Sequence, residues 1–493
     1  MRKLFIAKGA EGSGFMSKNK VMAFVIAAAL STMLCTACTS ANVSSDSSSA
    51  SAASSSMSAP PSGMPSGSAP GEPPSGGAPG GGPGGSSADI EYKASTEITS
   101  ADAQDGQTYS STTPDESALI VNTADAVTIS NPTVTKTGDS DGGDNCNFYG
   151  LNAGVLAMGG TQLTINGGTI ETDADGANGV FSYGGNGGRN GAEGDGTTVN
   201  ISDTTITTTG DGSGGIMTTG GGTTNASNLT VTTSGRSSAP IRTDRGGGTV
   251  YVDGGSYTSN GLGSPAIYST ADVNVANATL TSNLSEGVCI EGKNSITLTD
   301  SSLTANNTER NGHATFLDSI MIYQSMSGDA DSGTSSFNMT RGTLTSKSGH
   351  IFHVTNTNAV INLESVKLVN EDSANVLLSV CVDGWNGASN IATLNAKNQE
   401  LAGAILVGSD SQLTLNLTDG STFEGYIGGE IQNASGETVS SEVGTVAVTL
   451  DSSSTWTLTQ DTYVTSFDGD ASRVIANGHT LYVNGEALSG TSN

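Results

Sequence analysis

The sequence has few positive charges and few aromatic residues. Of 493 residues, 18 are Lys or Arg and 47 are Asp or Glu, so the formal net charge is −29. Nucleic-acid binding needs a positive field, so no nucleic-acid partner is expected. Aromatic residues make up 5% of the chain, which is too few to fill a wide core. The composition therefore favours a narrow core of Val, Ile, Leu, Thr and Ala over a doubly wound α/β enzyme.

The five cysteines form no recognisable framework. Cys35 and Cys38 lie near the N-terminus, and Cys146, Cys289 and Cys381 are widely separated. Their spacing matches neither a metal site nor an even-numbered disulfide set. We expect the last three to be small buried residues, with one disulfide as the alternative.

After residue 38 the chain shows no helical periodicity of useful length. It repeats a pattern of short predicted strands instead. An apolar strand returns from Val155 to Ile405 at intervals of about 28 residues, for example in "GVFSY", "PIRTD" and "AIYST". A second strand such as "TVYVD" follows, and often a third such as "GSYTS", with Gly, Asn, Asp and Ser between them. Three short strands per repeat describe one turn of a parallel β-helix. The sequence therefore predicts an all-β solenoid of about 12 turns over residues 89–493.

Alternation within the first strands predicts which side chains face outward. In "PIRTD", Ile241 and Thr243 are expected inside, and Arg242 and Asp244 outside. Aromatic faces beside charged groups suit sugar rings, so the outward stripe of first-strand residues is the expected ligand-binding groove. The alternative is that long loops after the third strands bury this stripe. The stripe consists of Phe181, Tyr183, Met217, Arg242, Tyr268, Glu291, Tyr323 and Phe352.

The repeat over residues 100–490 resembles the right-handed parallel β-helix of pectate-lyase-like proteins and adhesin-like bacterial surface proteins. Within it, "STWTLTQDTYVTSF" and the residues to 485 resemble the last turns of autotransporter-type and adhesin β-helices. Residues 445–493 are accordingly expected to form capping turns, because an open sheet edge recruits other chains. The resemblance implies an adhesin-like, carbohydrate-binding role.

Residues 1–38 have the pattern of a lipoprotein signal peptide, with Met16 as an alternative start. Lys18 and Lys20 precede the apolar run "VMAFVIAAALSTML", which is short for a membrane span, and small residues stand directly before Cys38. This resembles the lipobox of bacterial lipoproteins. It implies lipidation of Cys38 and a lipid anchor on the extracellular face of the bacterial membrane. An ordinary secretory signal cut near Ala37 is the alternative.

Residues 39–88 are mostly Ser, Ala, Gly and Pro. Eight of the twelve prolines fall between Pro60 and Pro83, and only Asp46 and Glu72 are charged. Such a segment buries almost no apolar area, so we expect a disordered linker that spaces the folded part from the membrane.

Acidic, Gly-rich loops follow several third strands, and stacked repeats bring them to one corner. Clusters of carboxylate oxygens bind Ca²⁺, so the sequence predicts a calcium site here. Asp-Gly pairs are also ordinary turn formers, which is the alternative. The candidate ligands are Asp139, Asp141, Asp144, Asp173, Asp175 and Asp211.

Three functional hypotheses follow. The first is a non-catalytic surface lipoprotein that binds polysaccharide or a host or neighbour-cell glycan. The second is a lyase acting on an acidic polysaccharide, in which Arg242, Arg245 and Asp244 would supply the base and neutralise the substrate carboxylate. For these three residues an ordinary Arg–Asp pair is the alternative. The third hypothesis is a structural surface stalk.

Overall fold

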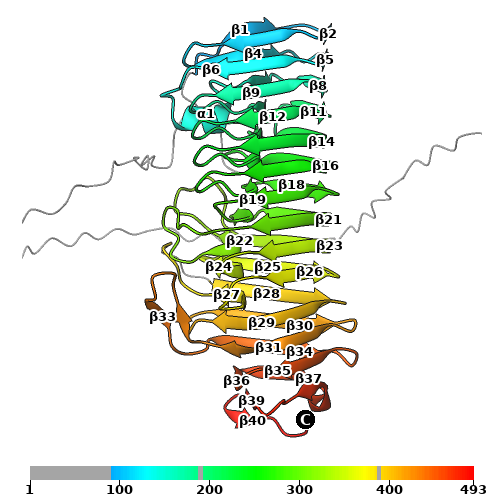
Figure 1. The fold of residues 1–493 in the computed structure, drawn as a ribbon, viewed down its shortest axis with the longest axis vertical. Coiled ribbons are helices and arrows are strands. Elements are labelled where there is room, and N and C mark those ends of the chain that lie inside the picture. The colour runs from blue at the N-terminus through cyan, green and yellow to red at the C-terminus, as the bar shows by residue number, and fades with distance from the viewer. Residues whose placement is uncertain (1–89, 187–192, 386–389) are drawn as a thin grey trace, which may run out of the picture. The chain divides into compact units, whose positions relative to one another are not determined.

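The computed structural model describes residues 90–186, 193–385 and 390–493, which wind as a parallel β-helix (Figure 1). The predicted signal peptide with Cys38 and the predicted linker lie outside the described residues. In the described ranges, no helix is long and apolar enough to cross a membrane.

Each turn contributes its first strand to one fifteen-stranded sheet, in which all neighbours pair in parallel. We call the outer side of this sheet the first face. The strands are β1 (Lys93–Ile98), β4 (Glu116–Asn122), β7 (Val155–Met158), β10 (Val180–Tyr183), β13 (Ile216–Thr219), β15 (Ile241–Thr243), β17 (Ile267–Ser269), β20 (Val288–Glu291), β22 (Asp318–Tyr323), β24 (His350–Thr355), β27 (Val376–Val380), β29 (Glu400–Val407), β31 (Thr422–Gly428), β35 (Thr455–Leu458) and β38 (Val474–Ile475).

The second and third strands of the turns share a twenty-stranded sheet, and the outer side of its second strands is the second face. The second strands are β2 (Asp102–Asp105), β5 (Ala126–Ser130), β8 (Gln162–Asn166), β11 (Thr198–Ser202), β14 (Gly222–Thr233), β16 (Gly248–Ser259), β18 (Asp272–Ala276), β21 (Ser295–Ala305), β23 (Thr334–Ser346), β25 (Thr357–Glu364), β28 (Asn390–Lys397), β30 (Gln412–Thr418), β34 (Thr445–Leu450) and β37 (Ser466–Gly469). Among them β14, β16, β21 and β23 continue through the third position. Separate third strands are β3 (Thr108–Ser111), β6 (Thr133–Thr137), β9 (Thr169–Asp173), β12 (Thr205–Thr208), β19 (Thr279–Ser282) and β26 (Lys367–Asn370).

The long strands bend between their second and third positions at residues with positive φ. Asn228 in β14 has φ of 53°, and its amide donates to Asp203 of the previous turn over 2.6 Å. Asn adopts this left-handed conformation more readily than most residues. In β23 the bend falls on Arg341, with φ of 57°, and its guanidinium is held by two 2.6 Å hydrogen bonds to Asp300. Side-chain bonds between successive turns therefore stabilise this corner.

The core is one continuous apolar cluster inside the coil, built from equivalent positions of successive turns. Ile216, Ile241 and Ile267 are paired in register on β13, β15 and β17, and all three are buried. Stacking at about 4.8 Å per turn lets each of them contact the next. The interior position of Lys136 is an exception. Its amine donates to three backbone carbonyls, including that of Gly138 over 2.7 Å, so the buried cation is hydrogen-bonded.

The predicted all-β parallel β-helix is confirmed, and its stack is longer than the predicted number of turns, because fifteen first strands are present. Helices are limited, within the described residues, to α1 (Asp144–Tyr149) and the 3-10 turn η1 (Ala471–Arg473). At the C-terminal end, Trp456 stacks on Phe423 with ring centroids 5.5 Å apart. The remaining strands are β32 (Ile431–Gln432), β33 (Thr438–Ser440), β36 (Thr462–Val464), β39 (Leu481–Val483) and β40 (Glu486–Ala487). The last three form a small sheet with one antiparallel pair.

Candidate functional site

The stripe predicted from the first strands is covered. Phe181 and Met217 have no exposed surface, and Tyr183 and Tyr323 are less than a tenth exposed. The expectation of an open groove on the first face is therefore wrong. The alternative, burial under loops after the third strands, holds for α1 and the Phe316 segment, but segments that follow the first strands β22 and β27 also contribute to the cover. The physical reason is that a row of aromatic and apolar side chains gains free energy when a loop shields it from water.

The predicted outward position of Phe352 is also wrong. Its register partners are Ile320 and Leu378, and its ring packs on that of Phe337 inside the coil with centroids 5.7 Å apart. The outward residue of β24 is His353, which pairs with Met321. The strand carries two adjacent apolar residues, Ile351 and Phe352, so alternation could be counted in either phase.

Three apolar clusters cover the first face. In the first, α1 places Phe148 and Tyr149 over β10, and the Tyr149 and Tyr183 rings meet edge to face at 5.8 Å. In the second, Trp385 packs on Tyr323 with centroids 4.9 Å apart. The third surrounds Phe316. Between the first two clusters lies a group of charged residues.

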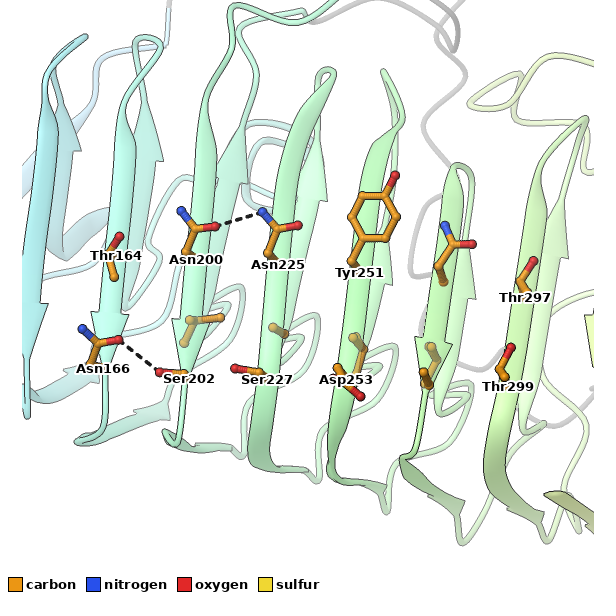
Figure 2. A pocket seen from close by; sticks show the side chains of 16 residues that line it. Thr164, Asn166, Asn200, Ser202, Asn225, Ser227, Tyr251, Asp253, Thr297 and Thr299 are labelled. Atoms are coloured by element: carbon orange, nitrogen blue, oxygen red, sulfur yellow. Dashed lines mark hydrogen bonds between the residues drawn. The ribbon is translucent and has the colours of Figure 1, made fainter. Parts of the chain in front are cut away.

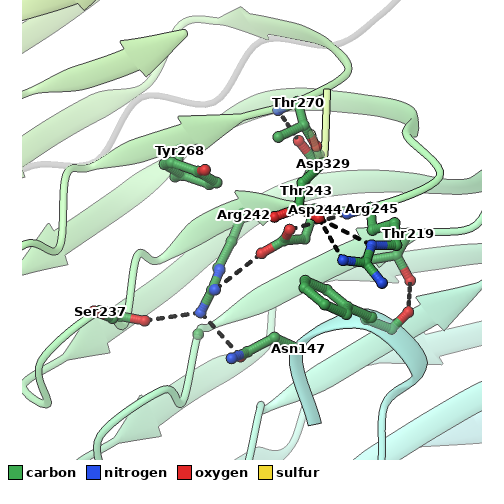
Figure 3. Close-up of polar contacts among 12 residues, drawn as sticks. Asn147, Thr219, Ser237, Arg242, Thr243, Asp244, Arg245, Tyr268, Thr270 and Asp329 are labelled. Atoms are coloured by element: carbon green, nitrogen blue, oxygen red, sulfur yellow. Dashed lines mark hydrogen bonds and ion pairs between the residues drawn. The ribbon is translucent and has the colours of Figure 1, made fainter. Parts of the chain in front are cut away.

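Arg242, from β15, is the centre of this charged group (Figure 3). Its guanidinium forms a 3.0 Å ion pair with Asp244 and donates to Asn147 over 3.1 Å and to the Ser237 carbonyl over 2.8 Å. Both side chains of the ion pair are about a tenth exposed or less. Burial raises the pKa of Asp244 to about 6, and the neighbouring Arg242 only partly offsets this rise.

Arg245 makes a second ion pair within the same group. It donates to Asp329 over 2.6 and 2.9 Å, and its guanidinium lies over the Phe148 ring at 4.0 Å from the centroid. Asp329 lies on the segment between β22 and β23, far along the chain. The contact therefore fastens that segment and α1 to the first face.

Glu291, from β20, accepts hydrogen bonds from two of the predicted ligand-binding tyrosines. The Tyr268 hydroxyl is 2.6 Å away, the Tyr323 hydroxyl 3.1 Å, and Ser325 also donates to this carboxylate. Glu291 itself is buried. The predicted stripe residues are thus brought together, but their polar groups are used within the protein. A pocket of about 200 Å³ remains beside Arg242 and Tyr268.

The ion pairs of Arg242 and Arg245 limit what these residues could do in a lyase reaction. A catalytic base must reach a substrate proton. Arg242 and Arg245 are both engaged by carboxylates, and Asp244 holds Arg242 while accepting the Arg245 backbone N–H over 3.0 Å. Arg242 and Asp244 form a buried ion pair, whereas the Arg245 side chain is about a third exposed and is held by Asp329.

The acidic loops do stack at one corner. The backbone N–H of Asp175 donates to Asp139 over 3.0 Å, that of Asp211 to Asp175 over 2.8 Å, and that of Arg236 to Asp211 over 2.7 Å. One oxygen of each carboxylate is therefore used to join neighbouring turns. Asp141 and Asp173 are exposed on the same loops, whereas Asp144, also exposed, lies near Arg245 and Asp329 of the charged group on the first face. Among the residues that the structure describes, no group of three or more His, Cys, Asp or Glu is arranged to hold a metal ion. Calcium binding stays a prediction.

Cys146, Cys289 and Cys381 are free and buried, as expected. Burial raises the pKa of the Cys146 thiol to about 11. These thiols are therefore protonated near neutral pH and are poor nucleophiles or metal ligands.

A Ser–His–Asp cluster that sequence reasoning missed lies beside the apolar cluster around Phe316. The His353 ring contacts the Ser379 hydroxyl over 2.8 Å and pairs with Asp383 over 3.3 Å, while Phe316 stacks on the ring at 4.6 Å. His350 shares the same hydroxyl over 2.8 Å. Ser379 and His353 have no exposed surface, so this cluster fastens loops and offers no access to a substrate.

The open surface lies instead on the second face. A hollow of about 540 Å³ extends along β8, β11, β14, β16, β18 and β21 (Figure 2). Tyr251 stands in its middle, half exposed. Around it are neutral polar side chains and one carboxylate, that of Asp253. The lining side chains labelled in the figure are Thr164, Asn166, Asn200, Ser202, Asn225, Ser227, Tyr251, Asp253, Thr297 and Thr299.

One row of outward positions runs through this hollow, and we call it the amide ladder. Each member is the register partner of the next on the following turn. It consists of Thr164, Asn200, Asn225, Tyr251, Asn274, Thr297, Asn338, Asn362, Asn395 and Asn416. Asn225 donates to Asn200 over 2.9 Å. The Asn274 side chain, directly beside Tyr251, makes no hydrogen bond within the described part of the chain. A free amide donor and acceptor therefore adjoin an exposed aromatic ring.

The sequence did hold a signal for this surface. Asparagine recurs at the middle of second strands, as in "TVNIS", "DVNVA", "SFNMT" and "TLNLT". Apolar neighbours on both sides of each Asn require it to point outward. Tyr251 is the one aromatic member of this row, whereas the first strands carry several aromatic residues and so give the stronger sequence signal.

Comparison with known proteins adds no relative: no protein-family model, no curated protein and no solved structure matches this chain.

Proposed function

We propose that this protein is a non-catalytic, adhesin-like binder of neutral polysaccharide, and that the hollow around Tyr251 is the binding site. Sugar rings stack on aromatic faces through their C–H groups and hydrogen-bond through their hydroxyls. Tyr251 supplies such a face, and Asn274 supplies a donor and an acceptor that no group in the described ranges uses. The juxtaposition of these two side chains is the observation that carries the proposal.

The charge of the site favours an uncharged ligand. Among the residues that the structure describes, no Lys or Arg lines the hollow, which contains Asp253, and the whole chain has a net charge of −29. An acidic polysaccharide would be repelled by this field. The same field disfavours nucleic acid. The proposed ligand is a bacterial, host or neighbour-cell glycan without uronic acid or sulfate groups.

The proposed location is the extracellular face of a bacterial membrane, where a lipid on Cys38 would anchor the chain. The support comes from the leader and linker patterns of the sequence. An anchor followed by a long polar spacer would present the hollow to glycans away from the membrane.

A glycan array tests this function with the full-length protein purified in mild detergent. We expect binding to neutral glycans and at least a tenfold loss of affinity for Tyr251→Ala. The matched control is Tyr463→Ala, because Tyr463 is 46% exposed and lies outside the hollow, stacked on Tyr482. Repeating the array with EDTA tests the calcium prediction. Absence of any glycan signal would favour the structural stalk, and release of unsaturated uronides from an acidic polysaccharide would favour the lyase.

A further inference from the structure

The amide ladder does not end at the hollow around Tyr251. Asn338 donates to Thr297 over 3.3 Å, which links the last ladder position of the hollow to the next turn. From there the chain of amides is unbroken: Asn362 donates to Asn338 over 2.7 Å, Asn395 to Asn362 over 2.8 Å, and Asn416 to Asn395 over 2.8 Å.

A second hollow lies on this continuation. It measures about 470 Å³ and is lined by residues of β23, β25, β28 and β30, among them four ladder asparagines and the core residues Met339 and Leu363. Because Asn338 belongs to the second hollow and Thr297 to the first, the two adjoin along one line. Lys397 and Glu364 in the second hollow form a 3.0 Å ion pair, so their charges are balanced. The second hollow, like the first, is nearly uncharged and combines apolar surface with amide and hydroxyl groups.

The direction of the ladder limits the shape of a ligand. Its members occupy ten successive strands, so the row spans nine steps of about 4.8 Å, or about 43 Å. One hexose ring in an extended chain is about as long as one such step. A linear chain of sugars that lies across the strands therefore meets an amide or hydroxyl at each unit. A branched glycan meets only a few of them.

We infer that both hollows together bind one unbranched, neutral polysaccharide chain that lies along the amide ladder, across the strands. This inference rests on the proposed function and adds the class of ligand, its orientation and its length. Tyr251 and Asn274 hold the chain at the first hollow, and Asn362 and Asn395 extend the contact along the second. Each additional contact is made without a new loss of translational freedom, so affinity rises with chain length.

The test measures binding of linear β-1,4-linked xylose, glucose and mannose oligomers, two to ten units long, to the full-length protein by calorimetry. For the series that binds, we expect affinity to rise beyond five units and to level off near nine. Asn395→Ala should weaken binding of the nine-unit oligomer at least fivefold and leave the four-unit oligomer within twofold. Tyr251→Ala should weaken both.

A matched control separates ladder effects from folding. Thr345→Ala changes an outward position of the third strand in β23, outside both hollows, and should leave all affinities within twofold. Circular dichroism checks that each variant keeps its strand content. An affinity that is flat beyond four units, with Tyr251 still required, would overturn the length inference alone. Failure of every oligomer and polymer to bind would overturn the proposed function as well.

Discussion

The first and second faces are two outer surfaces of one coil, and they differ in what covers them. The first face carries most of the outward aromatic residues and is largely covered by α1 and by the segments around Phe316, Asp329 and Trp385, apart from the small pocket beside Tyr268. The second face carries asparagine, threonine and serine and stays open around Tyr251. The difference follows from connection length. The long links flank the first strands on both sides, as between Ala305 and Asp318 and between Tyr323 and Thr334, whereas second and third strands are joined by links as short as Gly167–Gly168.

The comparison shows that outward alternation does not by itself make a binding surface. On the first face, the long loops pack over the apolar and aromatic side chains, because removal of apolar surface from water is favourable. On the second face, the amide side chains have little free energy to gain from burial, because they form hydrogen bonds with water and with one another along the ladder. An open surface in this coil is therefore one that is polar and has short connections.

The largest change in stability is expected when a buried side chain of the covered face, Phe181, is shortened. Phe181→Ala leaves a cavity under α1 and should lower the free energy of unfolding by about 3–5 kcal/mol. Urea denaturation followed by circular dichroism measures the change. Glycan binding by the folded fraction should be unchanged. A stability loss below 1 kcal/mol would mean that the cover over this face is loose.

Arg242→Ala should be next in size. It leaves the buried Asp244 carboxylate without its partner, which we expect to cost about 3 kcal/mol of unfolding free energy. The control is Arg310→Ala, because Arg310 is exposed. Combining Arg242→Met with Asp244→Leu should recover most of the loss. A double variant as unstable as Arg242→Ala would contradict the burial argument.

The covered face should also make the protein sensitive to acid. Burial, with the nearby His353, lowers the pKa of His350 from its ordinary 6.5 to about 3. The unfolded chain therefore binds a proton at His350 between pH 6.5 and 3 while the folded protein does not. This proton binding favours unfolding, so the free energy of unfolding is highest above pH 6.5 and decreases as the pH falls towards 3. The loss should approach 1.4 kcal/mol per pH unit. Denaturation at pH 7, 5.5 and 4 measures it. His350→Gln should flatten this dependence, and His479→Gln should not.

The smallest effect on stability is expected on the open face. Tyr251→Ala removes a half-exposed ring, so its unfolding free energy should stay within about 0.5 kcal/mol of the parent protein. The same denaturation experiment as for Phe181→Ala measures it. A large destabilisation would show that Tyr251 supports the coil, and its proposed role in binding would lose its basis.

Much of the fold could be predicted because each turn carries the same local pattern. The inward positions of Ile241 and Thr243, and the outward position of Arg242, followed from strict alternation and are confirmed. Phe352 could not be placed, because adjacent apolar residues allow two phases. The Arg245–Asp329 contact could not be foreseen, because it joins residues of different turns through a loop whose path has no repeat.

Sequence alone determined the coil of this protein, since alternating β-branched residues and turn-forming residues act over a few positions and recur at a regular interval. Only the tertiary structure decided which outer face is open. That outcome depends on where long, non-repeating loops come to rest, and their contacts with the coil are made between residues far apart in the chain.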